Sequence, residues 1–169
     1  MNKGLEVIEA KWLFNLRMDQ IDVIVHPQSI IHSMVQFEDG SIKAQMGLPD
    51  MKLPIQFALS YPDRIKSDFP RFNFVDYPQL TFEQPDMETF RNLGLAFESM
   101  KQGGNMPCIL NAANEVAVAK FLKDEIGFLE MSDLIENCMA KASFIKTPTY
   151  EDYVLSDTET RELAKAYKN

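Results

Sequence analysis

The sequence has few cysteines, no excess of basic residues and no long apolar run. Its 169 residues include 2 cysteines, Cys108 and Cys138, without a second pair, so a disulfide scaffold and a four-thiolate zinc site are excluded. Lysine and arginine number 17 against 25 aspartates and glutamates, a net charge of −8, so we expect no nucleic-acid partner. No stretch approaches the roughly 20 apolar residues that span a bilayer, and Met1–Glu6 has no apolar leader core. We therefore expect no membrane partner and a cytoplasmic location.

A dinucleotide-binding turn is missing as well. The chain has 7 glycines, and nowhere does a predicted strand lead through a glycine-rich turn into a helix. Such a turn cradles the pyrophosphate of a dinucleotide, so the chain offers no cradle of its own. Its 46% apolar and 25% charged residues nevertheless indicate an ordinary globular protein.

Prolines are concentrated in the middle of the chain. Proline lacks a backbone donor and biases its predecessor away from helix, so a proline-rich stretch is expected to be a connector. Mixed helix and strand patterns precede this stretch, and helical periodicity follows it. We therefore predict an α+β fold with an α+β piece at 1–60, a linker arm at 61–86 and a helical bundle at 87–169. Six of the nine prolines fall within 37 residues: Pro49, Pro54, Pro62, Pro70, Pro78 and Pro85.

Local signals place the individual elements. Asp39-Gly40 supplies the positive φ of a tight turn between two alternating segments, which predicts a β-hairpin. Asp86 is a candidate helix cap, and Ser156-Asp157-Thr158-Glu159 fits a capping box at the start of the last helix. The predicted elements are helices over 4–16, 87–101 and 108–124, a helix from Ser132, a helix from Ser156, and strands over 23–25, 31–37 and 42–46. The predicted bundle core includes Phe90, Leu93, Phe97, Val118, Phe121 and Leu122.

The predicted sheet is too small to be complete. One helix and three short strands leave unpaired edges and an uncovered face. We expect an upstream part of a longer chain, a second copy of this chain, or both, to complete it.

Three polar residues share the first turn of the first helix. Asn2, Lys3 and Glu6 fall within an arc of roughly 100° at a helix start, where free N–H groups attract anions. An amide and an ammonium there could hold an anion, and the carboxylate could hold Mg²⁺ or Mn²⁺. The alternative is a solvated turn with a Lys3–Glu6 pair worth a few tenths of a kcal/mol.

A second polar cluster runs from His26 to His32 between two predicted strands. Loops at strand ends often carry sites, because a rigid scaffold positions them. Each residue also has a structural interpretation: His26 could bond to backbone, Ser29 could form a turn, and His32 could be a satisfied core histidine.

Four motifs in one order carry a family resemblance. The motifs are Met1-Asn2-Lys3-Gly4-Leu5-Glu6-Val7-Ile8-Glu9-Ala10, His26-Pro27-Gln28-Ser29-Ile30-Ile31-His32-Ser33-Met34-Val35, Gly47-Leu48-Pro49-Asp50-Met51 and Leu110-Asn111-Ala112-Ala113-Asn114-Glu115. With these motifs the chain resembles, over essentially all 169 residues, the C-terminal portion of the 1-deoxy-D-xylulose 5-phosphate reductoisomerases.

The resemblance implies a fold and an activity. It implies a partial catalytic α/β-sheet domain, a proline-rich linker and a C-terminal helical bundle, in an enzyme that forms homodimers. The implied reaction converts 1-deoxy-D-xylulose 5-phosphate to 2-C-methyl-D-erythritol 4-phosphate in non-mevalonate isoprenoid biosynthesis, with NADPH and Mg²⁺ or Mn²⁺. Family members carry an NADPH-binding domain and two further metal carboxylates upstream. We therefore expect a fragment that is inactive alone.

The resemblance also implies residue roles. By position, Asn2, Lys3 and Ser29 resemble substrate-binding residues, and Glu6 resembles a metal ligand. His32 resembles a catalytic histidine that supports the active site, and Pro49 and Met51 correspond to cofactor-binding residues beside the nicotinamide. The alternatives are a non-catalytic sugar-phosphate-binding module and an oligomerisation module.

Overall fold

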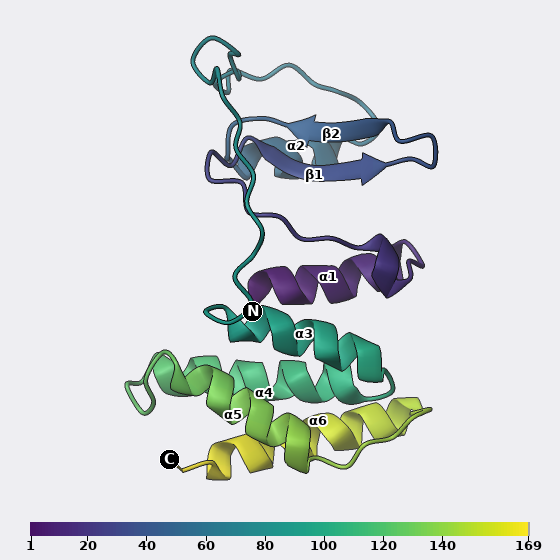
Figure 1. The fold of residues 1–169 in the computed structure, drawn as a ribbon, viewed down its shortest axis with the longest axis vertical. Helices are drawn as coiled ribbons and strands as arrows, with labels where there is room; N and C mark the ends of the chain where they lie inside the picture. Colours follow the sequence, from purple (N-terminus) through teal and green to yellow (C-terminus); the bar gives the residue numbers. More distant parts are fainter. Residues whose placement is uncertain (169) are drawn as a thin grey trace. The chain divides into compact units, whose positions relative to one another are not determined.

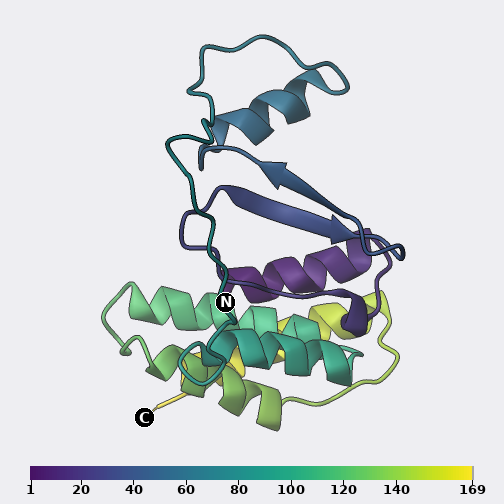
Figure 2. The same cartoon turned by 45° about the horizontal axis from the view of Figure 1, so that its top comes forward.

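In a computed structural model, residues 1–168 are described and pack into two compact units (Figures 1 and 2). The first unit joins Met1–Val23 to Pro85–Asn169, described as far as Lys168, and the second is Ile24–Gln84. Within residues 1–168, no helix has both the length and the apolar content needed to cross a bilayer.

The first unit is a helical bundle centred on α4. This helix contacts α3, α5 and α6, while α1 packs on α3. Burial of each large apolar side chain contributes about 1.5–3 kcal/mol, so the core around α4 is the main stabilising feature of the unit. Its elements are α1 (Asn2–Leu13), the short 3₁₀ helix η1 (Met18–Gln20), α3 (Arg91–Gln102), α4 (Met106–Phe121), α5 (Glu130–Lys141) and α6 (Tyr150–Ala166). Its most buried side chains include Ile109, Leu110, Ala113, Ala117, Leu134 and Ile135.

The second unit contains the predicted hairpin. β1 (Ile31–Gln36) pairs antiparallel with β2 (Ile42–Met46), in a register that sets Met34 opposite Ala44. Gly40 has a φ of +83°, and the Asp39 carboxylate accepts hydrogen bonds from the Ser41 N–H and hydroxyl at 2.9 and 2.6 Å. Those bonds, the hydroxyl first, lower the pKa of Asp39. The Asp-Gly turn prediction is confirmed.

The proline-rich stretch contains a helix that the sequence analysis missed. α2 (Lys52–Ser60) follows β2, and Pro54 is its third residue. Proline is tolerated in the first turn of a helix, where its missing N–H has no intrahelical partner. From 61 to 90 the structure has neither helix nor strand, apart from one isolated bridge, as expected of a connector.

One predicted strand and two predicted helix starts differ most from the structure. The segment 23–25 is not a strand; Val25 makes only an isolated bridge with Glu83. Asp86 caps a turn through the N–H groups of Glu88 and Thr89, at 3.0 Å each, and α3 begins only at Arg91.

The second helix start that differs is that of α6, which begins at Tyr150 rather than Ser156. Its capping box uses Thr149 and Asp152: the Asp152 N–H donates to the Thr149 hydroxyl at 3.2 Å, and the Thr149 N–H donates to the Asp152 carboxylate at 2.8 Å. The Asp152 carboxylate also accepts from the Thr149 hydroxyl at 2.9 Å. The two bonds to the carboxylate, the one from the Thr149 N–H first, lower the pKa of Asp152.

The predicted core is correct only in part. Leu93 is buried and Phe121 packs against the core, but Phe90, Val118 and Leu122 are exposed. Phe90 and Leu122 are the N-cap and C-cap residues of α3 and α4, where a helical face ends and no neighbouring turn covers it.

The fold class is confirmed in coarse form. The described residues are mostly helical, with a two-stranded sheet. The division at 60 and 86 stays a prediction, because packing units and enzyme domains are different divisions of a chain.

Candidate functional site

The first candidate group lies on the first turn of α1. The Lys3 ammonium and the Glu6 carboxylate form an ion pair with Nζ and Oε2 2.5 Å apart, and the two side chains are 56% and 53% exposed. Asn2 is exposed beside them, and no side chain caps the helix start. The solvated pair foreseen as the alternative is therefore present, with both charged groups accessible to a ligand.

Gly4 sets the position of this turn. Gly4 and Val7 are the buried residues of α1, which packs against α3. A Cβ added at Gly4 would lie 2.5 Å from the Ala96 Cβ, closer than real Cβ contacts come. The glycine thus permits the close approach that holds the charged side of the turn outward.

Two glycine-to-alanine substitutions test this packing, and we expect them to change the free energy of unfolding in opposite directions. We expect Gly4→Ala to lower the free energy of unfolding by about 1–3 kcal/mol through overpacking against Ala96. Gly94→Ala, in α3, has nothing within 4 Å of the added Cβ, so it should raise stability by about 0.5–1 kcal/mol. Urea unfolding followed by circular dichroism measures both. A Gly4→Ala protein as stable as the parent would contradict the close approach.

The second candidate group surrounds the start of β1. Ser29 has a φ of +51°, and its N–H donates to the His26 carbonyl at 2.9 Å, so the turn interpretation is confirmed. His26 bonds to backbone, as foreseen, with Nδ1 2.8 Å from the Thr81 carbonyl. His32 is exposed rather than in the core, and its Nε2 lies 3.1 Å from the Gly47 carbonyl.

Gly47 links this loop to the predicted cofactor residues. Its N–H donates to the Ile30 carbonyl at 2.9 Å, while its own carbonyl contacts His32. Pro49 follows two residues later and is exposed, and Met51, the N-cap of α2, is 70% exposed. Hydrogen bonds therefore connect the stretch that holds Ser29 and His32 to the turn that leads to Pro49 and Met51.

The two groups belong to different units, and each is positioned only within its own unit. Among residues 1–168, no cluster of three or more histidine, cysteine or acidic side chains could hold a metal ion. Glu6 thus offers one carboxylate of a metal site, not a complete set.

Gln28 and Thr81 are not among the predicted site residues, and their side chains hydrogen-bond to each other. Their separation of 53 residues leaves no local signal for this pairing.

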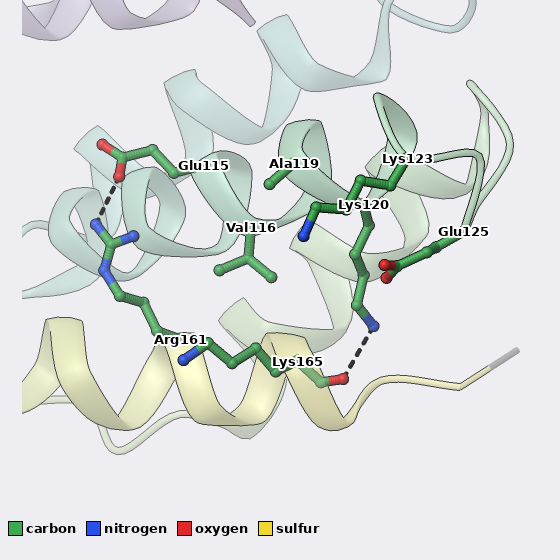
Figure 3. Close-up of a pocket in the computed structure, with 8 residues that line it drawn as sticks. All are labelled: Glu115, Val116, Ala119, Lys120, Lys123, Glu125, Arg161 and Lys165. Carbon is green, nitrogen blue, oxygen red and sulfur yellow. Dashed lines mark hydrogen bonds and ion pairs between the residues drawn. The ribbon is translucent and has the colours of Figure 1, made fainter.

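A cavity of about 430 Å³ elsewhere in the first unit contains none of the predicted site residues (Figure 3). Arg161 on α6 pairs there with Glu115 at 2.6 Å, and also with Asp157 at 2.8 Å. These carboxylates, Asp157 first, raise the pKa of Arg161. Lys120 donates to the carbonyls of Lys165 and Tyr167 at 3.0 Å each. The polar groups therefore join α4 to α6, which is a structural role.

The chain is similar to known proteins over almost its whole length. It is 67% identical over 165 residues to the 1-deoxy-D-xylulose 5-phosphate reductoisomerase of Bacteroides fragilis, and 54% identical over 166 residues to that of Porphyromonas gingivalis. These matches cover 98% of the chain but only 42% and 43% of the relatives, so the chain spans less than half of their length.

Two solved structures match as well. The Zymomonas mobilis enzyme in complex with NADPH superposes with a TM-score of 0.88 at 46% identity. A reductoisomerase in complex with NADPH, fosmidomycin and magnesium gives a TM-score of 0.90 at 38% identity. Each match covers 98% of the chain, and 44% and 43% of the solved chains respectively.

The fold of the chain thus corresponds to the C-terminal part of the reductoisomerases in those structures. Residues 46–163 match the model of the DXP reductoisomerase C-terminal domain. The chain belongs to the DXP reductoisomerase family.

Proposed function

We propose that this chain forms the substrate- and metal-contacting part of an enzyme that converts 1-deoxy-D-xylulose 5-phosphate to 2-C-methyl-D-erythritol 4-phosphate. The observation that carries the proposal is the accessible Lys3–Glu6 pair on a helix turn held by Gly4. An ammonium and a carboxylate one turn apart suit a substrate with a phosphate at one end and a metal-bound carbonyl at the other.

Each residue of the first group has a role in this proposal. Lys3 and Asn2 bind the phosphate and a hydroxyl, which lets remote binding energy orient the reacting carbons. Glu6 is an exposed oxygen donor and fits a hard divalent cation as one of several ligands. Bound Mg²⁺ or Mn²⁺ supplies polarisation of the substrate carbonyl.

The residues of the second group contact the substrate and the nicotinamide in this proposal. Ser29 donates a hydrogen bond from its hydroxyl to the substrate. A carbonyl only accepts, so His32 Nε2 donates to the Gly47 carbonyl, and this bond orients the ring of the proposed catalytic histidine. Pro49 and the exposed Met51 present apolar surface to the nicotinamide of NADPH.

The proposal includes partners outside the described chain. An upstream domain binds NADPH and supplies further carboxylates, and a second copy completes a cytoplasmic homodimer. The two-stranded sheet supports this part, because the hairpin has no further strand among residues 1–168 and exposes Val35 and Ile42 at 57% and 59%. Light scattering of the full-length enzyme tests the dimer.

A chimera tests the activity. We expect the 169-residue chain alone to oxidise no NADPH when given 1-deoxy-D-xylulose 5-phosphate and Mg²⁺ or Mn²⁺, because it lacks a pyrophosphate cradle. A chimera in which it replaces the matching 165 residues of the Bacteroides fragilis relative should turn over. The absorbance of NADPH at its nicotinamide band measures both. A folded but inactive chimera that still binds fosmidomycin would favour the non-catalytic binding module instead.

A further inference from the structure

A short segment of the connector, residues 81–83, is bonded to the loop that carries Ser29. Val25 and Glu83 form an antiparallel bridge, with each N–H donating to the other's carbonyl at 2.9 Å. Both residues of this bridge lie in the second unit. The backbone at Val25, where the loop that leads to Ser29 begins, is thus fixed by hydrogen bonds to Glu83, which lies far along the chain.

Gln28 makes the densest contact with this segment. Its Oε1 accepts from the Thr81 N–H at 3.1 Å and from the Thr81 hydroxyl at 3.3 Å, and its Nε2 lies 2.9 Å from the same hydroxyl oxygen. Both the oxygen and the nitrogen of the Gln28 amide therefore hydrogen-bond to Thr81, which fixes the position and orientation of the side chain.

His26 adds a third connection. Its ring stacks on Phe82 with centroids 4.9 Å apart, and Nδ1 lies 2.8 Å from the Thr81 carbonyl. A carbonyl only accepts, so Nδ1 carries the hydrogen. Nε2 is buried without a hydrogen-bond partner among the described residues, so no other hydrogen bond orients the ring.

These contacts lie next to a residue with a left-handed backbone conformation. Ser29 follows Gln28 directly, has the left-handed φ of +51°, and precedes Ile30, which is fully buried. A residue other than glycine keeps that conformation only where its surroundings impose it. We infer that residues 81–83 act as a clamp that positions Ser29 for substrate, with Gln28 and Thr81 as positioning residues; the inference rests on the proposed role of Ser29.

The test compares kinetic constants in the active chimera. Gln28→Ala should raise KM for 1-deoxy-D-xylulose 5-phosphate about tenfold, while kcat changes less than about threefold, because the residue orients a binding group and touches no reacting atom. Thr81→Ser keeps the hydroxyl and should retain the parent KM, whereas the isosteric Thr81→Val should raise it. Gln36→Ala is the matched control, since Gln36 is exposed at the end of β1.

A second measurement on the 169-residue chain is independent of activity. Hydrogen exchange of the Ser29 amide should be about tenfold faster in Gln28→Ala, with the β1 and β2 amides unchanged. Ser29→Ala with a parent KM would overturn the proposed role of Ser29. A raised KM in Ser29→Ala, together with parent KM and exchange in Gln28→Ala, would overturn the clamp alone.

Discussion

Asn105→Leu is expected to lower the free energy of unfolding by about 3–5 kcal/mol, because the variant removes three hydrogen bonds made by a fully buried side chain. Asn105 is fully buried just before α4. Its Nδ2 donates to the Ser143 carbonyl at 2.9 Å and to the Ser156 hydroxyl at 2.8 Å, and its Oδ1 accepts from the Ile145 N–H at 2.8 Å. One side chain therefore joins the start of α4, the segment before α6 and α6 itself.

Leucine has the same branched arrangement of side-chain heavy atoms and leaves no cavity, so the loss would come chiefly from the hydrogen bonds. Asn114→Leu is the matched control, because Asn114 lies on α4, is only half-buried and makes no side-chain hydrogen bond among the described residues. We expect it to change stability by less than about 0.5 kcal/mol. Urea unfolding measures both variants. Equal stability of Asn105→Leu and the parent would show that the network contributes nothing net.

Local signals were sufficient for much of the fold. The hairpin was predicted because Asp39 and Gly40 satisfy the turn by themselves. The 3.6-residue period located α3 and α4 to within a few residues. The start of α6 could not be located in this way, because Thr149–Asp152 and Ser156–Glu159 both have the spacing of a capping box. Tertiary contact decides between them: Ser156 is buried and bonded to Asn105, so its hydroxyl does not cap.

The candidate site, like the fold, was predictable where it depends on local sequence and not where it depends on contacts between distant segments. Asn2, Lys3 and Glu6 lie within about one helical turn of each other, so helix geometry alone places them on one side of the helix. The need for glycine at position 4 comes from its contact with Ala96 of α3. Helical periodicity within one segment does not show which residue of another helix it will contact. The Gln28–Thr81 contact depends on the path of the whole connector, and glutamine and threonine are too common to signal it.

Lys3→Ala should reduce kcat/KM of the chimera for 1-deoxy-D-xylulose 5-phosphate by about 100- to 1000-fold, the usual cost of removing a charged group that holds a substrate anion. Its stability should change by less than about 0.5 kcal/mol, because the Lys3–Glu6 pair is exposed and such pairs contribute little. A large kinetic effect with a negligible effect on unfolding separates a binding role from a structural one. Initial rates of NADPH oxidation and urea unfolding give the two quantities.

Two variants complete the comparison. Lys11→Ala removes a lysine from the last turn of the same helix and should leave kcat/KM within about twofold of the parent. Lys3→Arg keeps the positive charge but changes its geometry, so we expect it to recover part of the lost activity. If Lys3→Ala kept kcat/KM within threefold of the parent, Lys3 would be only the partner of Glu6 in a surface ion pair. The phosphate would then have to be held by other residues, and the proposed function would lose the observation that carries it.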